Sequence, residues 1–295
     1  MNKYLGIAVL LSVMAVGYGQ QEANLTLYRY HMNVFNPAVV GVDGETYINS
    51  TFRRQWANIP QAPATEAVSF GAAMGRNLGI GISLINDRTF VEAQTGTYID
   101  FSYRVKLSER TDLYLGIKAG GNNYRLNTAG LETYSYTSDP SLNNIQSFNP
   151  NIGAGAYLKG EKYHFSLAVP RLVESSYATD GDGVATVGTQ RIHLYVSGGY
   201  QFDLSADWTL LPTAFLRYVG GAPVSVDFTG MLSYANVLDF GASYRTDEAI
   251  SGIAAIRLSE RFTVGYAYET SLLNNLRGRV GNTHEFIMRF RLAPK

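Results

Sequence analysis

The sequence predicts an all-β fold, a transmembrane antiparallel up-and-down β-barrel of about fourteen strands. Three observations lead to this prediction. Apolar and polar residues alternate with period two from residue 46 onward, short and longer connections alternate, and charges fall on one face of each strand. Strict alternation is typical of strands with one apolar and one polar face. Short turns at one rim and longer loops at the other are typical of outer-membrane barrels, whose short turns face the periplasm.

Composition agrees with an exported β protein. The chain has 21 Tyr and 30 Gly among 295 residues, and charged residues make up only 16%. Abundant Tyr and Gly favour strands and turns over helices. The formal net charge of zero argues against a nucleic-acid-binding protein, which carries clustered basic surface. Because the chain has no Cys, it can form neither a disulfide framework nor a thiolate metal site.

Residues 1–19 are predicted to be an export signal. Lys3 supplies the positive charge, and the apolar stretch behind it is too short to span a bilayer as a helix. Small residues predict cleavage directly after Gly19, which leaves 276 of the 295 residues, enough for one large β domain or two smaller ones. We expect residues 20–44 to form an N-terminal periplasmic segment or lumen plug, and residues 45–295 to form the barrel in the cell outer membrane.

Fourteen segments follow the alternation rule. They cover residues 45–54, 64–75, 78–86, 95–106, 111–120, 150–159, 162–170, 190–202, 207–219, 223–234, 237–246, 249–258, 261–269 and 283–292. Most have the length of about 9–11 residues that a tilted strand needs to cross a hydrocarbon core. An even number of strands closes the sheet and leaves no exposed edge.

The connections favour a membrane barrel over a β-sandwich or an enzyme fold. Every second link is short, namely residues 76–77, 108–110, 160–161, 204–206, 235–236 and 259–260. The links between them are mostly longer, namely 55–63, 87–94, 121–149, 171–189, 220–222, 247–248 and 270–282. Two of these, 220–222 and 247–248, are short and break the rule locally.

Charged residues indicate which face meets lipid. An Arg or Lys that faces the middle of a bilayer costs about 2–4 kcal/mol, so the polar face of each strand is predicted to line the lumen. The expected lumen-facing charges are Asp100, Arg104, Lys118, Asp227, Asp239, Arg245, Arg257, Glu269, Arg289 and Arg291.

A stretch without alternation, NLTLYRYHMNVFNPAVVG, precedes the first strand. Residues spaced i, i+3, i+4 and i+7 from Leu27 are compatible with two helical turns that stop before Pro37. Asn36 with Pro37 favours a turn, and Gly41 frees the backbone. This stretch is either a tether with an ordinary turn or a plug that enters the lumen from the periplasm. A barrel of fourteen strands is wide enough to need filling or to leave a passage.

A second motif, RRQWANIPQAP, lies where the first strand becomes the first longer loop. Arg53, Gln55 and Trp56, together with two prolines, predict a rigid amphipathic loop. Its Trp is either an anchor at the membrane interface or a contact for a partner.

Catalytic, cofactor and metal sites are not expected. His164 and His193 are offset by their strand register, whereas His284 and Glu285 are neighbours that point to opposite faces. Neither arrangement brings a base to a nucleophile. No cluster of His, Asp and Glu has metal-ligand spacing. The glycines of GIG and GAG are strand glycines and predict no phosphate loop.

The motif order resembles a known family. FNPAVVG, followed by RRQW and a Pro-containing loop, resembles the opening of the PorP/SprF-like outer-membrane proteins of the type IX secretion system. The segments LPTAFLRYVGGAPVSVDFTGML and GNTHEFIMRFRL are also similar to that family, so the resemblance covers essentially the whole mature chain. The motif positions that it marks as plug or partner candidates are Asn36, Pro37, Gly41, Arg53, Gln55, Trp56, His284 and Glu285.

This resemblance implies a non-enzymatic outer-membrane barrel, without a cofactor, that assists type IX secretion. Its implied partners are a large adhesin or other cargo with a type IX C-terminal domain, components of the secretion machinery, and outer-membrane lipid, with a link to gliding motility. The loops 121–149, 171–189 and 270–282 would offer the docking surface. Two alternatives stay open. The first is a passive or hydrophobic-compound-conducting channel with an N-terminal hatch, although fatty-acid-transporter-like barrels are usually much longer, and the second is a small structural porin.

Overall fold

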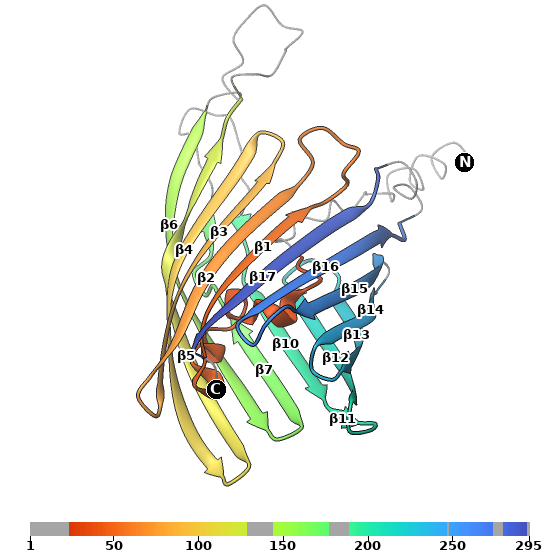
Figure 1. The fold of residues 1–295 in the computed structure, drawn as a ribbon. Helices are drawn as coiled ribbons and strands as arrows, with labels where there is room; N and C mark the ends of the chain where they lie inside the picture. The colour runs from red at the N-terminus through yellow and green to blue at the C-terminus, as the bar shows by residue number, and fades with distance from the viewer. Residues whose placement is uncertain (1–23, 129–143, 177–188, 247, 274–279, 294–295) are drawn as a thin grey trace, which may run out of the picture.

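A computed structural model describes residues 24–128, 144–176, 189–246, 248–273 and 280–293. The described residues form a closed antiparallel barrel with a short N-terminal segment inside it (Figure 1). The predicted export signal at residues 1–19 lies outside the described residues. Among the described residues, no helix combines the length and the apolar character that crossing a membrane requires.

The barrel strands correspond to the fourteen segments that alternation predicts. They are β1 (Thr46–Arg54), β2 (Ala64–Met74), β3 (Leu78–Thr89), β4 (Glu92–Ser108), β5 (Thr111–Leu126), β6 (Ile145–Gly160), β7 (Tyr163–Val169), β10 (His193–Tyr200) with its continuation β11 (Phe202–Asp203), β12 (Trp208–Val219), β13 (Ser225–Tyr234), β14 (Leu238–Arg245), β15 (Ala249–Arg257), β16 (Phe262–Ser271) and β17 (Thr283–Ala293). A separate two-stranded sheet, β8 (Ser175–Ser176) with β9 (Thr189–Gln190), lies in the link between β7 and β10.

Pairing between consecutive strands closes the sheet. The first strand β1 pairs with the last strand β17, and β10 pairs with both β7 and β12. The register of β11 on β12 continues that of β10, and the ladder is interrupted only where Tyr200 and Gln201 pass Pro212 and its neighbour. Proline has no N–H to donate to a ladder, so this break lies within one strand. The fold prediction, a fourteen-stranded antiparallel barrel, is confirmed.

The two ends of the barrel differ. One end, the turn rim, carries the short links at residues 75–77, 109–110, 161–162, 204–207, 235–237 and 258–261, together with the C-terminal end of β17. The other end, the loop rim, carries the links at 55–63, 90–91, 127–144, 170–192, 220–224, 246–248 and 272–282. Two loop predictions were too long. The link predicted at 87–94 is a two-residue hairpin connection, and the strands β5 and β6 take up much of 121–149.

Side-chain exposure follows the alternation. Large apolar residues are exposed on the outer surface, for example Ile117 at 62% and Phe228 at 55%. Asp227, the neighbour of Phe228 on the opposite face of β13, is only 1% exposed. Such a band of apolar side chains around an ionised interior matches a hydrocarbon surrounding.

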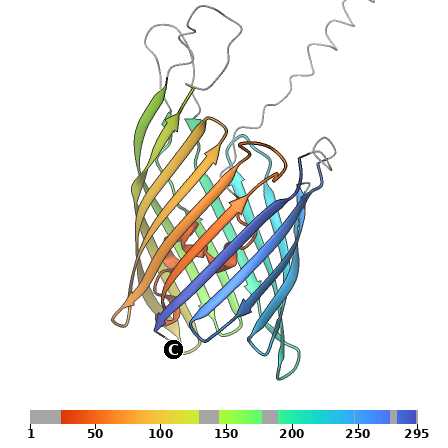
Figure 2. The same ribbon diagram turned by 45° about the horizontal axis from the view of Figure 1, so that its top comes forward.

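The N-terminal segment, residues 24–44, lies within the ring of strands (Figure 2). It consists of four single 3₁₀ turns, η1 (Tyr28–Tyr30), η2 (Met32–Val34), η3 (Pro37–Val39) and η4 (Val42–Gly44). The two helical turns expected from Leu27 are therefore 3₁₀ turns, not one α-helix. Short 3₁₀ pieces are usual where the surroundings, and not helix propensity, fix the backbone.

Candidate functional site in the occupied lumen

The N-terminal segment runs from one rim of the barrel to the other. Asn24 lies at the loop rim, beside the first residue of β10 and the link between β12 and β13. At the opposite end, Asp43 forms an ion pair with Lys159, the penultimate residue of β6 beside a short turn. The segment therefore contacts the barrel interior over its whole height, and this interface is the candidate functional site.

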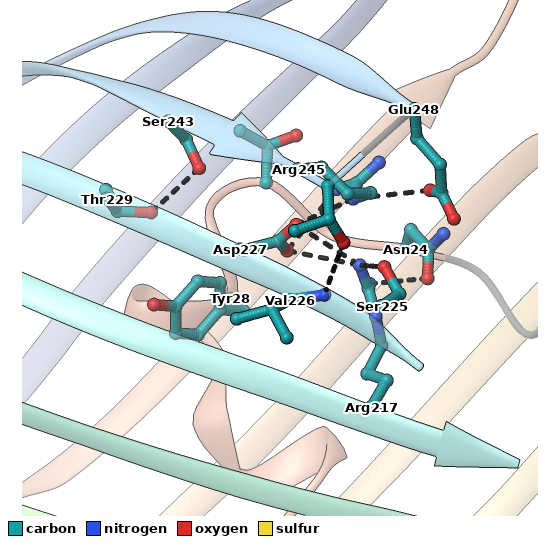
Figure 3. Close-up of polar contacts among 12 residues, drawn as sticks. Asn24, Tyr28, Arg217, Ser225, Val226, Asp227, Thr229, Ser243, Arg245 and Glu248 are labelled. Atoms are coloured by element: carbon teal, nitrogen blue, oxygen red, sulfur yellow. Dashed lines mark hydrogen bonds and ion pairs between the residues drawn. The ribbon is translucent and has the colours of Figure 1, made fainter. Parts of the chain in front are cut away.

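A chain of alternating charges holds the first residues of the segment (Figure 3). Arg217 donates a hydrogen bond to the side chain of Asn24 and forms an ion pair of 3.2 Å with Asp227. Arg245 binds the same Asp227 at 2.8 Å and reaches Glu269 at 3.2 Å. These side chains come from β12, β13, β14 and β16, so positive and negative charges alternate around one level of the lumen.

Arg53 extends this chain across the closure between β1 and β17. Its Nη2 lies 2.7 Å from Glu269 and its Nη1 lies 3.0 Å from Glu285. Glu285 in turn accepts the backbone N–H groups of Thr26 and Leu27, each at 2.8 Å. The Thr26 hydroxyl also donates to Glu269 at 2.9 Å. One carboxylate thus binds both the barrel closure and the segment's backbone.

Breaking this buried ion pair would strongly destabilise the protein. The side chains of Arg53 and Glu285 are 3% and 1% exposed, and Arg53 and Glu285 are direct neighbours in the register of β1 and β17. A buried charge that loses its partner costs about 3–5 kcal/mol. The segment's N–H groups satisfy lone pairs of Glu285 that the arginine leaves free, so the segment and the ion pairs stabilise one another.

The Asn36-Pro37 element packs on the opposite wall. The Asn36 side chain accepts the N–H of Ala38 at 2.8 Å, which caps η3, and donates to Ser166 at 2.8 Å and to the Ala156 carbonyl at 3.0 Å. Proline follows at the first position of this turn, where its missing N–H costs nothing. A single amide therefore shapes the turn and ties it to β6 and β7.

Inward-facing glycines allow the barrel wall to approach the Asn36-Pro37 element closely. A Cβ on Gly116 would lie 2.3 Å from the nitrogen of Ala38, and one on Gly155 would lie 2.1 Å from Oδ1 of Asn36. On β3, a Cβ on Gly79 would lie 2.2 Å from the carbonyl oxygen of Val40. Gly79 of the GIG run and Gly116 thus allow backbone-to-backbone contact, and Gly155 of the GAG run makes room for the Asn36 side chain.

Gly41 ends this contact with a left-handed backbone, at φ 73°. A Cβ there would also lie 2.8 Å from the Cα of Gly79. Both the backbone angle and the close approach require glycine at this motif position.

Hydroxyl groups hold the middle of the segment. Nδ1 of His31 lies 2.7 Å from the Thr51 hydroxyl, and Nε2 lies 2.7 Å from the Ser69 hydroxyl. A Ser–His contact is also the core of many hydrolase sites. Here, however, all three residues are 1% exposed, and the third partner is a hydroxyl and not a carboxylate. The arrangement leaves a substrate no access, so its role is to hold the segment against β1 and β2.

A buried ion pair contacts the segment just after His31. Lys118 forms an ion pair of 2.7 Å with Asp100, and both side chains are almost fully buried. The Lys118 ammonium also donates to the Asn33 carbonyl at 3.1 Å. The lysine therefore links β4 and β5 to the segment.

Apolar contacts complete the interface. Tyr28 stacks on Phe215 at a ring-centroid distance of 4.4 Å, and Phe35 packs on Tyr195 at 5.2 Å. A second cluster surrounds Leu27 and comprises the inward-facing residues Met231, Ile253, Ala267 and Ile287. Alternation alone did not predict these contacts. An available signal was a large apolar residue on the polar face of its strand, as at Phe215, Met231 and Ile287.

The ten expected lumen charges all have an ion-pair partner. Besides the pairs described above, Arg104 binds Asp112 at 2.7 Å, Arg257 lies 3.7 Å from Asp239, and Arg289 and Arg291 both bind Glu45. Glu45 directly follows the segment in sequence and lies at the turn rim. Glu45, Asp112 and Arg217 are not among the expected lumen charges, although each is a partner in one of these ion pairs.

The remaining motif positions are not part of the lumen site. Gln55 and Trp56 begin the loop after β1, where the N–H of Gln55 donates to the Pro63 carbonyl at 2.9 Å. His284 lies on the outer face of β17 and hydrogen-bonds the Tyr266 hydroxyl at 2.7 Å. His284 and Glu285 thus point to opposite faces, and only Glu285 reaches the segment. Among the described residues, no group of three or more His, Cys, Asp and Glu side chains is placed to hold a metal ion.

Solved structures share the barrel fold at low sequence identity. A Pseudomonas aeruginosa FadL homologue has a TM-score of 0.51 and 9% identity, covering 88% of this chain and 93% of its own. The CymD monoaromatic hydrocarbon channel has a TM-score of 0.51 and 9% identity, with coverage of 89% and 91%. The Ralstonia pickettii toluene transporter TbuX has a TM-score of 0.50 and 11% identity, with coverage of 87% and 92%. At such identities the likeness concerns the fold alone.

The sequence itself matches a family model over nearly its whole length. No curated protein matches the chain. The family model described as type IX secretion system membrane protein PorP/SprF matches residues 17–290. This range includes the segment, β1, most of β17 and the Arg53–Glu285 pair. The chain therefore belongs to the PorP/SprF family of type IX secretion system membrane proteins.

Proposed function

We propose that this protein is a non-enzymatic, closed accessory barrel that docks an exported protein during type IX secretion. In this proposal the N-terminal segment is a plug, and the links at the loop rim contact the cargo, an adhesin or another protein with a type IX C-terminal domain. The observation that carries the proposal is that residues 24–44 occupy the lumen and are tied to strands around the barrel. A barrel with this interior supports attachment better than free passage.

The shape of the loop rim supports docking. β4, β5 and β6 have 17, 16 and 16 residues, whereas β14 on the far side has 8. Because a tilted strand needs about 9–11 residues to cross the hydrocarbon core, the long strands extend beyond it on one side. Figure 1 shows this side rising above the rest of the loop rim. The docking loops predicted at 121–149, 171–189 and 270–282 lie partly outside the described residues.

A conducting channel is the competing function. Two of the similar structures are a hydrocarbon channel and a toluene transporter, which favours this class by fold alone. The lumen of this chain gives a contrary indication, because buried ion pairs and packed aromatic rings surround the segment. We therefore place channel function second.

Recording across planar lipid bilayers discriminates the two functions. For the intact protein we expect no steady conductance, together with co-purification of a large exported protein from the native cells. Deletion of residues 24–41 should leave the barrel inserted, which heat-dependent gel mobility checks, and should produce steady conductance. Open conductance of the intact protein without any bound exported protein would contradict the proposal. An inserted deletion variant that stays silent and still retains its partner would contradict the plug.

A further inference from the structure

We propose that the N-terminal segment threads the barrel from the outside, so that the mature N-terminus is displayed at the cell surface. This inference rests on the plug geometry and on barrel orientation, and it is independent of the docking role. The sequence-based hypothesis had the plug entering from the periplasm, which is the opposite direction.

Contacts at the first described residue indicate where the segment begins. Asn24 shares a small cavity with His193, the first residue of β10, and with Val219, the last residue of β12. The same cavity includes Ala222 in the link between β12 and β13. All three elements belong to the loop rim, so the chain enters the barrel there.

The following contacts descend through the barrel in sequence order. Thr26 and Leu27 bind Glu285, the third residue of β17 from the loop rim. His31 then contacts Thr51 on β1 and Ser69 on β2, further from that rim. The segment does not turn back between these contacts.

The end of the segment lies at the turn rim. A Cβ on Gly41 would meet Gly79, the second residue of β3 after a short turn. Asp43 binds Lys159 next to the link at 161–162, and Glu45 binds Arg291 near the end of β17 at 3.2 Å. About 20 residues thus cover the full height of the barrel, which extended and 3₁₀ backbone allows at about 2–3 Å per residue.

Orientation then assigns the two ends. Short turns of outer-membrane barrels face the periplasm and longer loops face outward. Asn24 is therefore at the outer mouth. With the predicted cleavage before Gln20, only residues 20–23 precede it in the mature chain. The link 220–224 lies at the same mouth beside Asn24, where an extracellular partner can reach the beginning of the plug.

The segment also contacts the closure of the barrel from inside. Arg53 on β1 and Glu285 on β17 bind each other and both contact Thr26. The segment therefore packs against the inner face of the strand pair that closes the barrel.

Single-thiol labelling tests the inference, since the chain has no Cys and each variant carries one thiol. Three variants are compared, Gln21→Cys before the segment, Gly220→Cys in the link at the loop rim, and Glu161→Cys in a turn at the turn rim. A Cβ on Gly220 meets no atom within 4 Å, and Glu161 is exposed, so neither control disturbs packing. The probe is a membrane-impermeant maleimide applied to intact cells and to permeabilised cells.

We expect Gln21→Cys to react on intact cells to the same extent as Gly220→Cys, with Glu161→Cys reacting only after permeabilisation. The inference is overturned if Gln21→Cys behaves like Glu161→Cys, or if it reacts only after unfolding in detergent. It is also overturned if the two controls exchange behaviour, because the barrel orientation is then reversed. None of these outcomes depends on conductance or on cargo, so failure of the threading and failure of the proposed function are distinguishable.

Discussion

Arg53 is the residue on which most of the lumen contacts converge. Its guanidinium binds carboxylates from β16 and β17, and it also donates to the Thr26 hydroxyl at 3.2 Å. A planar guanidinium with several donors suits such a junction better than the ammonium of lysine does. The PorP/SprF motif that contains Arg53 thereby meets the motif that contains Glu285, from the far end of the chain.

The substitution Glu285→Gln tests this junction. It keeps the shape of the side chain but removes its charge, so Arg53 loses one of two buried partners and the segment loses its strongest acceptor. We expect the free energy of unfolding to fall by about 3 kcal/mol, at the lower end of the range for buried pairs. The midpoint of urea unfolding in detergent micelles measures this change.

The matched control is Arg88→Ala. Arg88 and Glu66 form an ion pair of 2.7 Å, against 3.0 Å for Arg53 and Glu285, but their side chains are 54% and 46% exposed. Exposed pairs contribute only about 0–1 kcal/mol. Equal losses in the two variants would show that burial of the Arg53–Glu285 pair has no particular weight.

At the scale of elements, the N-terminal segment takes its shape from the wall. Its residue spacing is compatible with a helix, yet it forms separate 3₁₀ turns because side chains and backbone groups of many strands capture it at intervals. Asn36, Lys118 and Ser102 each bond across the interface, the last donating to the Val40 carbonyl at 2.5 Å. Contacts of this kind outweigh local helix propensity, which is weak over so short a stretch.

The close approach of wall and segment predicts that a side chain at Gly116 displaces η3. We expect Gly116→Leu to expose the segment, because even a Cβ there would lie 2.3 Å from the nitrogen of Ala38. The reporter is the background substitution Val40→Cys, at a position that is 0% exposed. Its thiol should be protected from maleimide in detergent-solubilised protein and should become reactive when Gly116→Leu is added.

Gly252→Leu serves as the control for that experiment. Gly252 faces outward, and a Cβ there meets no atom within 4 Å. It should leave the Val40→Cys thiol protected. A thiol equally protected in both double variants would mean that the wall tolerates a side chain at Gly116 and that the glycine contact does not hold the segment.

At the scale of the whole molecule, polarity is arranged opposite to that of a water-soluble protein. Apolar side chains such as Ile117 are exposed on the outside, whereas ionised side chains such as Asp100 and Lys118 are buried in pairs. Buried charges without partners would strongly destabilise the fold. The lumen supplies these partners from neighbouring strands and from the segment.

This arrangement predicts a dependence on depth for charges placed on the outer surface. Ile117→Arg, in the middle of β5, should lower the free energy of unfolding from lipid vesicles by about 2–4 kcal/mol. Leu107→Arg, beside the turn rim, should lower it by only about 0–1 kcal/mol. Both positions are exposed, at 62% and 55%, so packing does not distinguish them. Equal costs would contradict the assignment of the outer surface to lipid.

Much of the barrel follows from the sequence alone. Alternation with period two is a local property that repeats along each strand, so it reveals the number of strands, the parity that carries charge and the rhythm of the links. Alternation predicts less well where each strand begins and ends. The link predicted at 87–94 is mostly strand, because polar residues such as Asp87 and Gln94 alternate less clearly while they still pair across β3 and β4.

The sequence by itself determined the β-barrel class, the polarity of its two faces and the motifs of its family, since each depends on residue types at fixed short spacing. Only the tertiary structure decided that Arg53 and Glu285 meet across 232 positions of sequence, that the glycines of β3, β5 and β6 receive the Asn-Pro turn, and in which direction the segment runs. Alternation tells which face a side chain occupies. Its partner on that face is set by strand register and closure, which arise only when the whole chain has folded.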